Sequence, residues 1–258
     1  MQALLELKNV CVQRGNRLAL DRLTLSVGQG EHVAILGPNG SGKSTLIKTI
    51  TRECYPLLEP DTMLRIMGQD SWNIFELRRH LGMVSNELMA QCTREITGIE
   101  LVVSGFFGSI GIGPNHEVTD EMKKQALAAM ERLEVTHLAD RWLDELSSGE
   151  GRRLLIARAL IHQPETLLLD EPTTSLDLPS LREVRGQLRK LAGAGVGLLL
   201  ITHHLDDIIP EIERVVLLRD GRVAFDGPKA EVLTSERLSE TFGIPLDVIS
   251  RDGYYHAW

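Results

Sequence analysis

The stretch Gly37–Ser44, GPNGSGKS, lies between the short apolar run Val33–Leu36 and a predicted helix at Ser44–Arg52. It fits the pattern G-x-x-x-x-G-K-[ST] in the strand–loop–helix setting that the pattern requires. Glycines let backbone N–H groups crowd around phosphate oxygens, and the N-terminus of the next helix adds positive potential. An incidental glycine turn does not account for all four fixed positions. The stretch therefore predicts a phosphate-binding loop.

The side chains of this loop are expected to hold both a nucleotide and a metal ion. We expect Lys43 to reach the outer phosphates and to act in catalysis, and Ser44 to give its hydroxyl to Mg²⁺. The predicted nucleotide-binding residues are Gly37, Pro38, Asn39, Gly40, Ser41, Gly42, Lys43, Ser44 and Thr45.

An acidic pair ends a second apolar run, in the sequence LLLDEP at 167–172. Asp170, at the end of a buried strand, is predicted to hold the Mg²⁺ shell. Glu171, next to it, is placed to polarise an attacking water. Two solvated acids at a strand end would be an ordinary alternative in isolation, but not beside a phosphate loop. The pair favours hydrolysis over nucleotide binding alone.

A second stretch, Leu146–Arg153 (LSSGEGRR), also has the features of an anion site, with small residues at the start of a predicted helix. Ser148 could add a hydrogen-bond donor or cap that helix. Arg152 and Arg153 are interpreted as a charged helix face rather than as phosphate ligands. The chain therefore raises the question of why it carries two such loops.

The order of apolar runs predicts an α/β fold with a P-loop NTPase core, a mostly parallel sheet, an N-terminal antiparallel β subdomain and an inserted α-helical subdomain. The segments LLELKNVCV and LALDRLTLSV alternate as antiparallel strands around a turn at Gly15-Asn16. Met122, Ala126, Met130 and Leu133 recur at helical spacing in the insert. The buried strand candidates are Val33–Leu36, 81–85, Thr166–Leu169, Gly197–Ile201 and Arg214–Leu218, the last forming a hairpin with Arg222–Phe225 through Asp220-Gly221.

Composition narrows the class of partner. The chain of 258 residues has 28 Lys and Arg against 36 Asp and Glu, a net charge of −8, and no Lys/Arg block. No nucleic-acid partner is expected of such an acidic chain. Cys11, Cys54 and Cys92 lie far apart and are interpreted as free thiols in a reducing compartment.

No segment predicts secretion or membrane insertion. The sequence MQALLELKNV lacks the features of a secretion signal. The longest apolar run, near Val196–Ile201, is far shorter than the ~20 residues that a spanning helix needs. We therefore expect a soluble, cytoplasmic chain whose membrane role, if it has one, depends on a partner.

Taken together, these motifs resemble the ATP-binding subunit of an ABC transporter over nearly the whole chain. LSSGE resembles the family's signature loop, commonly LSGGQ, and RRLLIARAL continues in the family's manner. Ser175–Asp177 match the D-loop, and His203 matches the switch histidine. The order and spacing of these elements agree with the family. The resemblance implies one ABC ATPase domain at 1–258, with a core at about 1–86 and 161–258 and a helical subdomain at about 87–160.

The resemblance also implies how the site works. Two ATPase domains, as a homodimer or as paired subunits, hold two ATP molecules head-to-tail between them. Each ATP meets the phosphate loop of one subunit and the signature loop of the other. Glu171 would be the general base, His203 would contact the γ-phosphate, and Asp177 would communicate across the dimer. The signature residues implied at the nucleotide are Ser147, Ser148, Gly149 and Glu150.

The inserted helices are implied to touch an integral membrane permease, which would hold the subunit peripherally on the inner face of the cell membrane. The sequence LVVSGFFGSIG, at 101–111, lies where metal-chelate and molybdate-type importers have their permease-facing helix. An alternative is an ABC-type ATPase that works without a permease, for example in cofactor assembly. Intact Glu171 and His203 disfavour a third possibility, a regulatory subunit that does not hydrolyse ATP.

Two positions depart from the family pattern. Arg14 stands where an aromatic residue usually stacks on adenine; its guanidinium could also stack, or it could be a solvated turn residue, and both remain open. Asn86 replaces the glutamine that usually reaches Mg²⁺ or water; it keeps the amide on a shorter side chain.

Two further features are interpreted as structural. His203-His204 and Asp206-Asp207 are not predicted to form a metal site, because adjacent side chains diverge, and His204 is expected to face solvent. The aromatic tail Gly253–Trp258, GYYHAW, is expected to pack on the domain or on a partner.

Overall fold

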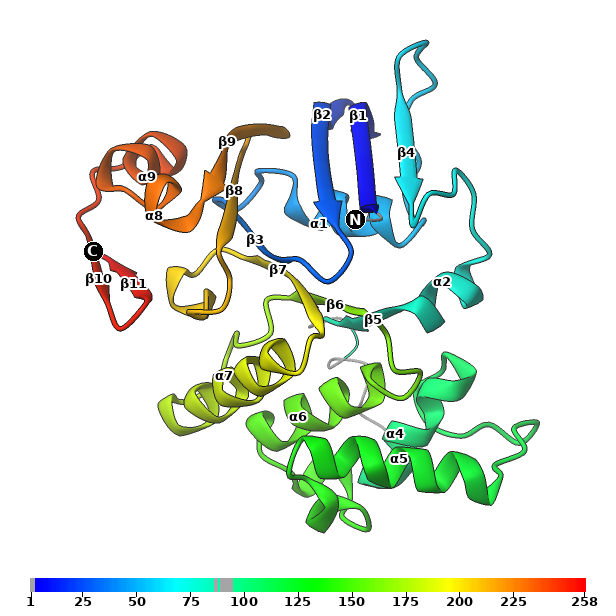
Figure 1. Cartoon of the computed structure of the whole chain (residues 1–258). Coiled ribbons are helices and arrows are strands. Elements are labelled where there is room, and N and C mark those ends of the chain that lie inside the picture. Colours follow the sequence, from blue (N-terminus) through cyan, green and yellow to red (C-terminus); the bar gives the residue numbers. More distant parts are fainter. Residues whose placement is uncertain (1–2, 86–87, 89–94) are drawn as a thin grey trace.

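A mostly parallel sheet crosses the centre of the molecule and separates the N-terminal strands from a group of helices (Figure 1). The computed structural model describes residues 3–85, 88 and 95–258, and within them this sheet has six strands in the order β5-β6-β7-β3-β8-β9. All neighbours run parallel except β8 and β9, which confirms the predicted topology and hairpin. The strands are β3 (His32–Leu36), β5 (Leu81–Val84), β6 (Thr166–Asp170), β7 (Gly197–Thr202), β8 (Arg214–Arg219) and β9 (Arg222–Pro228).

The N-terminal strands form a separate antiparallel sheet in the order β2-β1-β4, in which the pairing of β1 with β2 was predicted and that of β4 was not. Its strands are β1 (Ala3–Arg14), β2 (Arg17–Gly28) and β4 (Met63–Ile66). The turn between β1 and β2 contains Gly15, whose φ of +59° is easily adopted by glycine. Helix α1 (Lys43–Ile50) packs between this sheet and the central one, with Leu46, Ile47 and Ile50 buried.

The predicted helical insert lies between β5 and β6. Its elements are α4 (Gly98–Val103), η1 (Ser104–Phe107), α5 (Asp120–Arg132), η2 (Thr136–Leu138), η3 (Leu143–Glu145) and α6 (Ser148–Ala159), and α2 (Ile74–His80) precedes β5. In α5 the predicted apolar face is present, because Ala126 and Met130 are buried and Met122 is half-buried. Asn86 and Cys92 lie outside the described residues, whereas Cys11 and Cys54 are free and buried.

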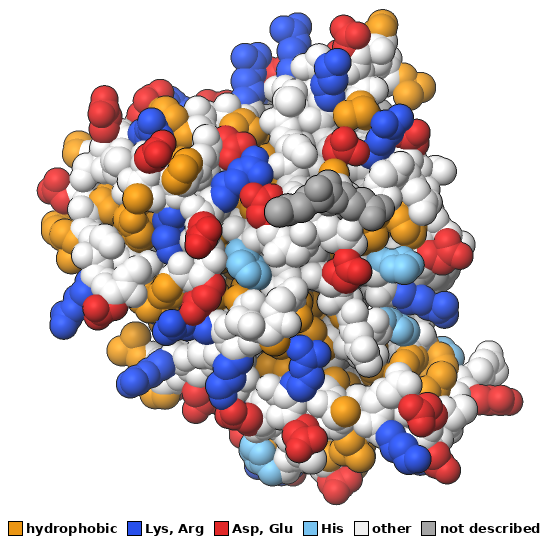
Figure 2. Space-filling view, in the orientation of Figure 1, with side chains coloured by type: hydrophobic (Ala, Val, Ile, Leu, Met, Phe, Trp, Pro, Cys, Tyr) orange, Lys and Arg blue, Asp and Glu red, His pale blue; other side chains and the backbone are white. Residues whose placement is uncertain are grey.

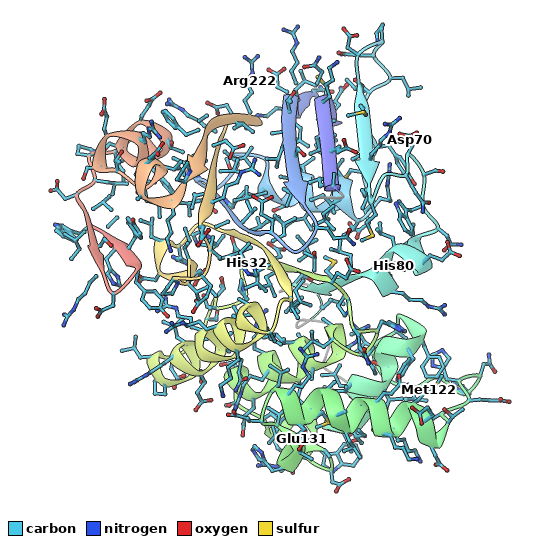
Figure 3. The ribbon with its side chains drawn as sticks, in the orientation of Figure 1. His32, Asp70, His80, Met122, Glu131 and Arg222 are labelled. Carbon is cyan, nitrogen blue, oxygen red and sulfur yellow. The ribbon has the colours of Figure 1, made fainter. Side chains whose placement is uncertain are left out.

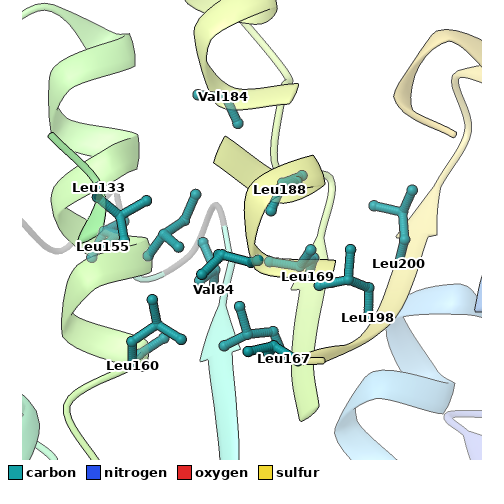
Figure 4. Close-up of a cluster of buried hydrophobic side chains, with 14 of the residues drawn as sticks. Val84, Leu133, Leu155, Leu160, Leu167, Leu169, Val184, Leu188, Leu198 and Leu200 are labelled. Carbon is teal, nitrogen blue, oxygen red and sulfur yellow. The ribbon is translucent and has the colours of Figure 1, made fainter. Parts of the chain in front are cut away.

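The alternating side chains of β6 and β7 join two hydrophobic clusters, one on each face of the central sheet. Leu167 and Leu169 face the helices, while Leu168 between them faces α1 and the N-terminal sheet. Figure 4 shows the helical side, where Leu167, Leu169, Leu198 and Leu200 meet Leu155 of α6 and Leu188 of α7. Burial on both faces explains why the runs Leu167–Leu169 of β6 and Leu198–Ile201 of β7 are apolar at every position.

The part of the chain after β6 adds further helices and a separate two-stranded sheet. It contains α7 (Leu178–Gly193), η4 (Leu205–Asp207), α8 (Lys229–Val232), α9 (Ser235–Phe242), β10 (Val248–Arg251) and β11 (Tyr254–Ala257). Strands β10 and β11 pair as a hairpin, and Tyr254 and Tyr255 pack against the larger hydrophobic cluster, so the aromatic tail packs on the domain. No helix among the described residues has the length and apolar character needed to cross a membrane.

Candidate functional site

The phosphate loop joins β3 to α1, and its lysine is folded back over the loop. Lys43 Nζ donates to the carbonyl oxygens of Gly37 at 2.7 Å and Pro38 at 3.0 Å. Burial lowers the pKa of Lys43, and the carboxylates of Glu171 and Asp170 act in the opposite direction. The structure therefore brings the predicted lysine and the predicted acidic pair to one place, at the carboxyl ends of β3 and β6.

Two glycines of the loop are required by close backbone approach. A Cβ on Gly37 would lie 2.3 Å from the carbonyl oxygen of Leu218, and a Cβ on Gly42 would lie 2.6 Å from that of Ala19. Gly42 also has a φ of +109°, which side chains of L-residues rarely adopt. Ser41 Oγ is buried and has no hydrogen-bond partner among the described residues, whereas Ser44 is exposed.

The acidic pair is positioned by a sharp turn at the end of β6. Glu171 has a φ of +47°, and its N–H donates to the carbonyl oxygen of Ile201 at 2.8 Å. Its Oε1 lies 2.6 Å from Nδ1 of His203, which follows the neighbouring strand β7. Thr174 Oγ1 donates to Glu171 Oε2 at 3.4 Å. The predicted base and the predicted switch histidine are thus direct partners, although they lie 32 positions apart in sequence.

A buried polar cluster lies behind this pair and was not anticipated from the sequence. Asp207, only 2% exposed, accepts hydrogen bonds from the hydroxyls of Thr173 and Thr202. Arg152 of α6 is 3% exposed; burial lowers its pKa, and the carboxylates of Asp170 and Asp207 favour its charged form. These contacts connect the segment after β6 with the segment after β7.

The prediction that Arg152 belongs to a charged helix face was wrong. The first turns of α6 are covered by other elements, so that Gly149, Gly151 and Arg152 are all buried. Arg153 is also mostly covered, and its guanidinium pairs with Glu183 of α7 at 3.1 Å. A sequence signal for this burial was the apolar run Leu154–Ala157 that follows directly, because four consecutive apolar residues surround the helix axis.

The second glycine stretch starts α6 with a capping box. Ser147 Oγ accepts from Glu150 N–H at 3.3 Å, and Glu150 Oε2 accepts from Ser147 N–H at 2.8 Å. Ser147 is therefore the capping residue, and the alternative that Ser148 caps the helix was wrong, because Ser148 is already in the first turn. The Ser147 backbone N–H is the main cause of the lowered pKa of Glu150.

The signature stretch contacts the start of α7. A Cβ on Gly149 would lie 2.5 Å from the side chain of Ser180, so a larger residue at this position would push the two helices apart. Asp177 caps α7, with Oδ1 accepting from Ser180 N–H at 3.1 Å. Hydrogen bonds from Ser180 lower the pKa of Asp177. The predicted signature and D-loop residues therefore meet through Ser180, a residue that the sequence analysis did not identify.

The two glycine-containing stretches have different neighbours within the chain. The phosphate loop contacts β2, β8 and the β8–β9 turn, where Gly221 N–H donates to the carbonyl oxygen of Ser41 at 2.9 Å. The signature stretch contacts α7 through Gly149, and Arg152 near its end faces Asp170 and Asp207. Figure 1 shows α1 in the upper part of the molecule, beside β2, and α6 in the lower part, across the central sheet.

The remaining predicted positions have mixed outcomes. Arg14 lies at the exposed end of β1, where its Nη1 donates to Cys54 Sγ at 3.2 Å, so adenine stacking stays a prediction. Asn86, predicted near the metal, lies outside the described residues. His204 is exposed, as predicted, and its ring packs 3.8 Å from the ring of His203. Among the described residues, no three His, Cys, Asp or Glu side chains are arranged to hold a metal ion.

Comparison with known proteins gives consistent results. Residues 20–174 match the model of a family described as ABC transporter. A hemin import ATP-binding protein, HmuV of Bradyrhizobium diazoefficiens, is 33% identical and covers 98% of this chain and 93% of its own length.

Two solved structures share the fold of this chain. The structure of cbiO1 from Clostridium perfringens, part of the ABC transporter complex cbiONQ, has a TM-score of 0.77 at 27% identity, covering 93% of this chain and 94% of its own. The dimeric ATP-binding cassette MJ0796, bound to ADP and Pi, has a TM-score of 0.69 at 28% identity, covering 87% of this chain and 98% of its own.

Proposed function

Because the chain belongs to the ABC transporter family of ATP-binding, ATP-hydrolysing subunits, we propose that it powers transport of a solute through a separate membrane permease. Two copies, or one copy and a paired subunit, would close around two ATP molecules. The observation that carries this proposal is the separation of the phosphate loop and the signature stretch on different parts of one chain. A single copy would offer each ATP only half of its ligands.

The phosphate loop is proposed to bind the phosphates of ATP through Lys43 and its backbone N–H groups. Lys43 Nζ donates to the carbonyl oxygens of Gly37 and Pro38. Phosphate oxygens form stronger, charge-assisted hydrogen bonds than carbonyls do, so the ammonium would turn to the outer phosphates of ATP. The buried Ser41 Oγ gives a further hydroxyl facing its own loop. Gly37, Pro38, Asn39, Gly40, Gly42 and Thr45 would supply the surrounding backbone N–H groups and walls.

Oxygen donors at the end of the loop fit a magnesium ion. Ser44 presents a hydroxyl and Asp170 a carboxylate, the donor types that Mg²⁺ takes in nucleotide sites. Asn86 is proposed as a third donor, through its side-chain amide oxygen. A bound Mg²⁺ would supply charge neutralisation on the phosphate oxygens.

Glu171 and His203 are proposed to act on the attacking water. The Glu171 carboxylate is held by two neighbours, His203 on Oε1 and Thr174 on Oε2, so its orientation is fixed before substrate binds. A carboxylate fixed in this way can accept the proton of a water aimed at the γ-phosphate. His203 would leave its hydrogen bond to Glu171 for the γ-phosphate, which makes the pair sensitive to whether ATP is present.

The signature stretch is proposed to complete the site of the other copy. The N–H groups in the first turn of a helix have no partners within the helix. The capping box uses the Ser147 hydroxyl and the Glu150 N–H, so the N–H groups of Ser148 and Gly149 point along the axis of α6. With the helix dipole, they would bind the γ-phosphate of ATP held by the other copy. Asp177, which meets Gly149 through Ser180, would carry the effect across the dimer.

A groove between the sheet and the helical insert supports a site for the permease. A cavity of about 670 Å³ is lined by β5, by the 105–110 segment and by the end of α6. A smaller cavity of about 260 Å³ beside it is lined by Arg78, Arg79, His116 and His162 together with Phe106, Phe107 and two glycines. We propose that a permease segment with an acidic side chain occupies this groove and holds the subunit on the inner face of the cell membrane.

The positive charge of the groove favours such an acidic partner. Burial is the main cause of the lowered pKa of His162, and the positive charges of Arg79, Arg158 and His80 lower it further. Figure 2 shows histidine and basic side chains close together beside α2, where Figure 3 labels His80. A carboxylate in this position would relieve the repulsion among these cations.

Capture of the tagged chain from detergent-solubilised membranes of its source organism tests the transport proposal. We expect an integral membrane protein in stoichiometric amount, and about tenfold less of it with Arg78→Glu, because the reversed charge would repel an acidic partner. Arg251→Glu is the matched control, since its side chain is 84% exposed at the tip of the C-terminal hairpin. Recovery of soluble partners alone would instead support an ATPase that works without a permease.

A further inference from the structure

The hairpin β10–β11, residues 248–257, lies against the segment that follows the switch histidine. We propose that this C-terminal hairpin positions His203, through ties to residues 206–210 made by His256 and Lys229. The inference rests on the proposed role of His203 in hydrolysis and extends it to a part of the chain remote from the nucleotide. His256 and Lys229 are therefore assigned as positioning residues.

The first tie joins the hairpin to η4. His256 Nδ1 of β11 lies 2.5 Å from Asp206 Oδ1, and both side chains are about half-exposed. An exposed side-chain contact of this kind contributes little to global stability. The contact instead restrains η4 locally, because Asp206 is next to Asp207. The carboxylate of Asp207 accepts hydrogen bonds from Thr173 and Thr202 on the buried side. The short helix η4 is thus held on its outer side by the hairpin and on its inner side by the polar cluster.

The second tie is the ammonium group of Lys229, which joins the segment at Ile209 and Pro210 to the turn of the hairpin. Lys229 Nζ donates to the carbonyl oxygens of Ile209 at 3.2 Å, Pro210 at 3.0 Å and Gly253 at 3.2 Å. These bonds use all three donors of the lysine, with the third reaching the turn of the hairpin. Burial lowers the pKa of Lys229, while Glu211 and Glu213 favour its charged form. Lys229 Nζ also lies 5.9 Å from the centre of the Tyr255 ring.

Close packing holds the turn of the hairpin β10–β11 against Pro210, in the segment that follows η4. A Cβ on Gly253 would lie 3.0 Å from Cβ of Pro210, and Gly253 has a φ of +80° that favours glycine. Tyr254 faces α7, where the guanidinium of Arg185 lies 5.7 Å from its ring. The hairpin therefore touches η4, the turn at Pro210 and α7.

A few direct contacts connect η4 with His203 and Glu171. His204 N–H donates to Thr202 Oγ1 at 3.0 Å, and Asp207 N–H donates to the carbonyl oxygen of His204 at 3.3 Å. The ring of His204 in turn packs on His203, which contacts Glu171. A shift of η4 would change the orientation of His203 without moving the phosphate loop, which makes no contact with the hairpin among the described interactions.

Steady-state kinetics of the full chain with MgATP test this assignment. Lys229→Met removes the three donors and keeps an apolar stem, and we expect kcat to fall about fivefold with KM for ATP unchanged. Asp206→Asn and His256→Ala should each lower kcat by about threefold, and the double variant no further, because they break one interaction. Exchanging the two residues, Asp206→His with His256→Asp, should restore kcat. Arg251→Ala, at the exposed tip of the same hairpin, is the control and should leave kcat unchanged.

Native-state hydrogen exchange provides a readout that does not depend on catalysis. In Lys229→Met, the amides of Asp207 and Ile208 should exchange faster, while that of Leu46 in α1 should keep its rate. Wild-type kcat in the Lys229 and His256 variants, or additive losses in the double variant, would overturn the proposal. If His203→Ala itself turns over normally, the proposed role of His203 fails instead, and the two failures are distinguishable.

Discussion

Replacing Glu171 with glutamine should lower ATP hydrolysis by about 10²–10⁴-fold while leaving ATP affinity unchanged. The amide keeps the size of the carboxylate and its place between His203 and Thr174. It cannot accept the proton of the attacking water, so the bound ATP would persist. Since closed subunits are expected to separate only after hydrolysis, the variant should accumulate as a dimer in the presence of MgATP, which size-exclusion chromatography measures.

The control for this variant lies at the other end of the same strand. Glu165→Gln makes the same chemical change at an exposed residue that immediately precedes β6, whereas Glu171 immediately follows it. It should keep the wild-type turnover and should not trap a dimer. Unchanged turnover in Glu171→Gln would remove Glu171 from the role of general base.

Replacing Lys43 with alanine should weaken ATP binding by roughly 10–150-fold, since a hydrogen bond to a charged group is worth about 1.5–3 kcal/mol. The ammonium of Lys43 lies over the loop, on the carbonyls of Gly37 and Pro38. Removing it leaves the negative charge of the outer phosphates without its nearest cation and next to Asp170 and Glu171. Titration calorimetry with ATP measures the change.

Lys48→Ala is the matched variant for Lys43→Ala, because Lys48 lies in the last turn of the same helix, α1. It should bind ATP as the wild type does. Normal ATP affinity in Lys43→Ala would contradict the assignment of Gly37–Ser44 as the nucleotide loop.

Local sequence was sufficient to predict the central sheet and the loops at its carboxyl edge. The apolar runs of β6 and β7 indicated burial on both faces, and Leu167, Leu168 and Leu199 are buried as this requires. The predicted phosphate loop has a local sequence pattern because close backbone contacts require glycine at two of its positions, Gly37 and Gly42. The buried strands and the glycine loop could be predicted because each depends on residues that are close together in the sequence.

Features that depend on tertiary packing were missed. Arg152 looked like a surface residue because its burial arises from α7 and the segments after β6 and β7, which follow it in the chain. Asp207 was read as one of a pair of acids, although only Asp207 is buried and hydrogen-bonded to Thr173 and Thr202. Ser147 was the capping residue rather than Ser148, because the position of a helix end shifts by one residue without changing the sequence pattern.

The proposal that the two glycine stretches serve different nucleotides came from the family resemblance, because their order along the chain does not indicate it. Their separate neighbours in space support it, with Gly221 beside the predicted phosphate loop and Ser180 beside the signature stretch. Contacts between two chains leave no periodic pattern in either sequence. The composite site is therefore the part of the account that most needs a direct test.

The ATPase rate per subunit, measured over a wide range of protein concentration at saturating MgATP, tests the composite site most directly. If each ATP needs the phosphate loop of one copy and the signature stretch of another, the rate per subunit should rise with concentration and then level off as dimers form. The rise should move to lower concentration when a permease holds two copies together. A rate per subunit that stays at its full value in dilute samples shown by light scattering to be monomeric would contradict the account.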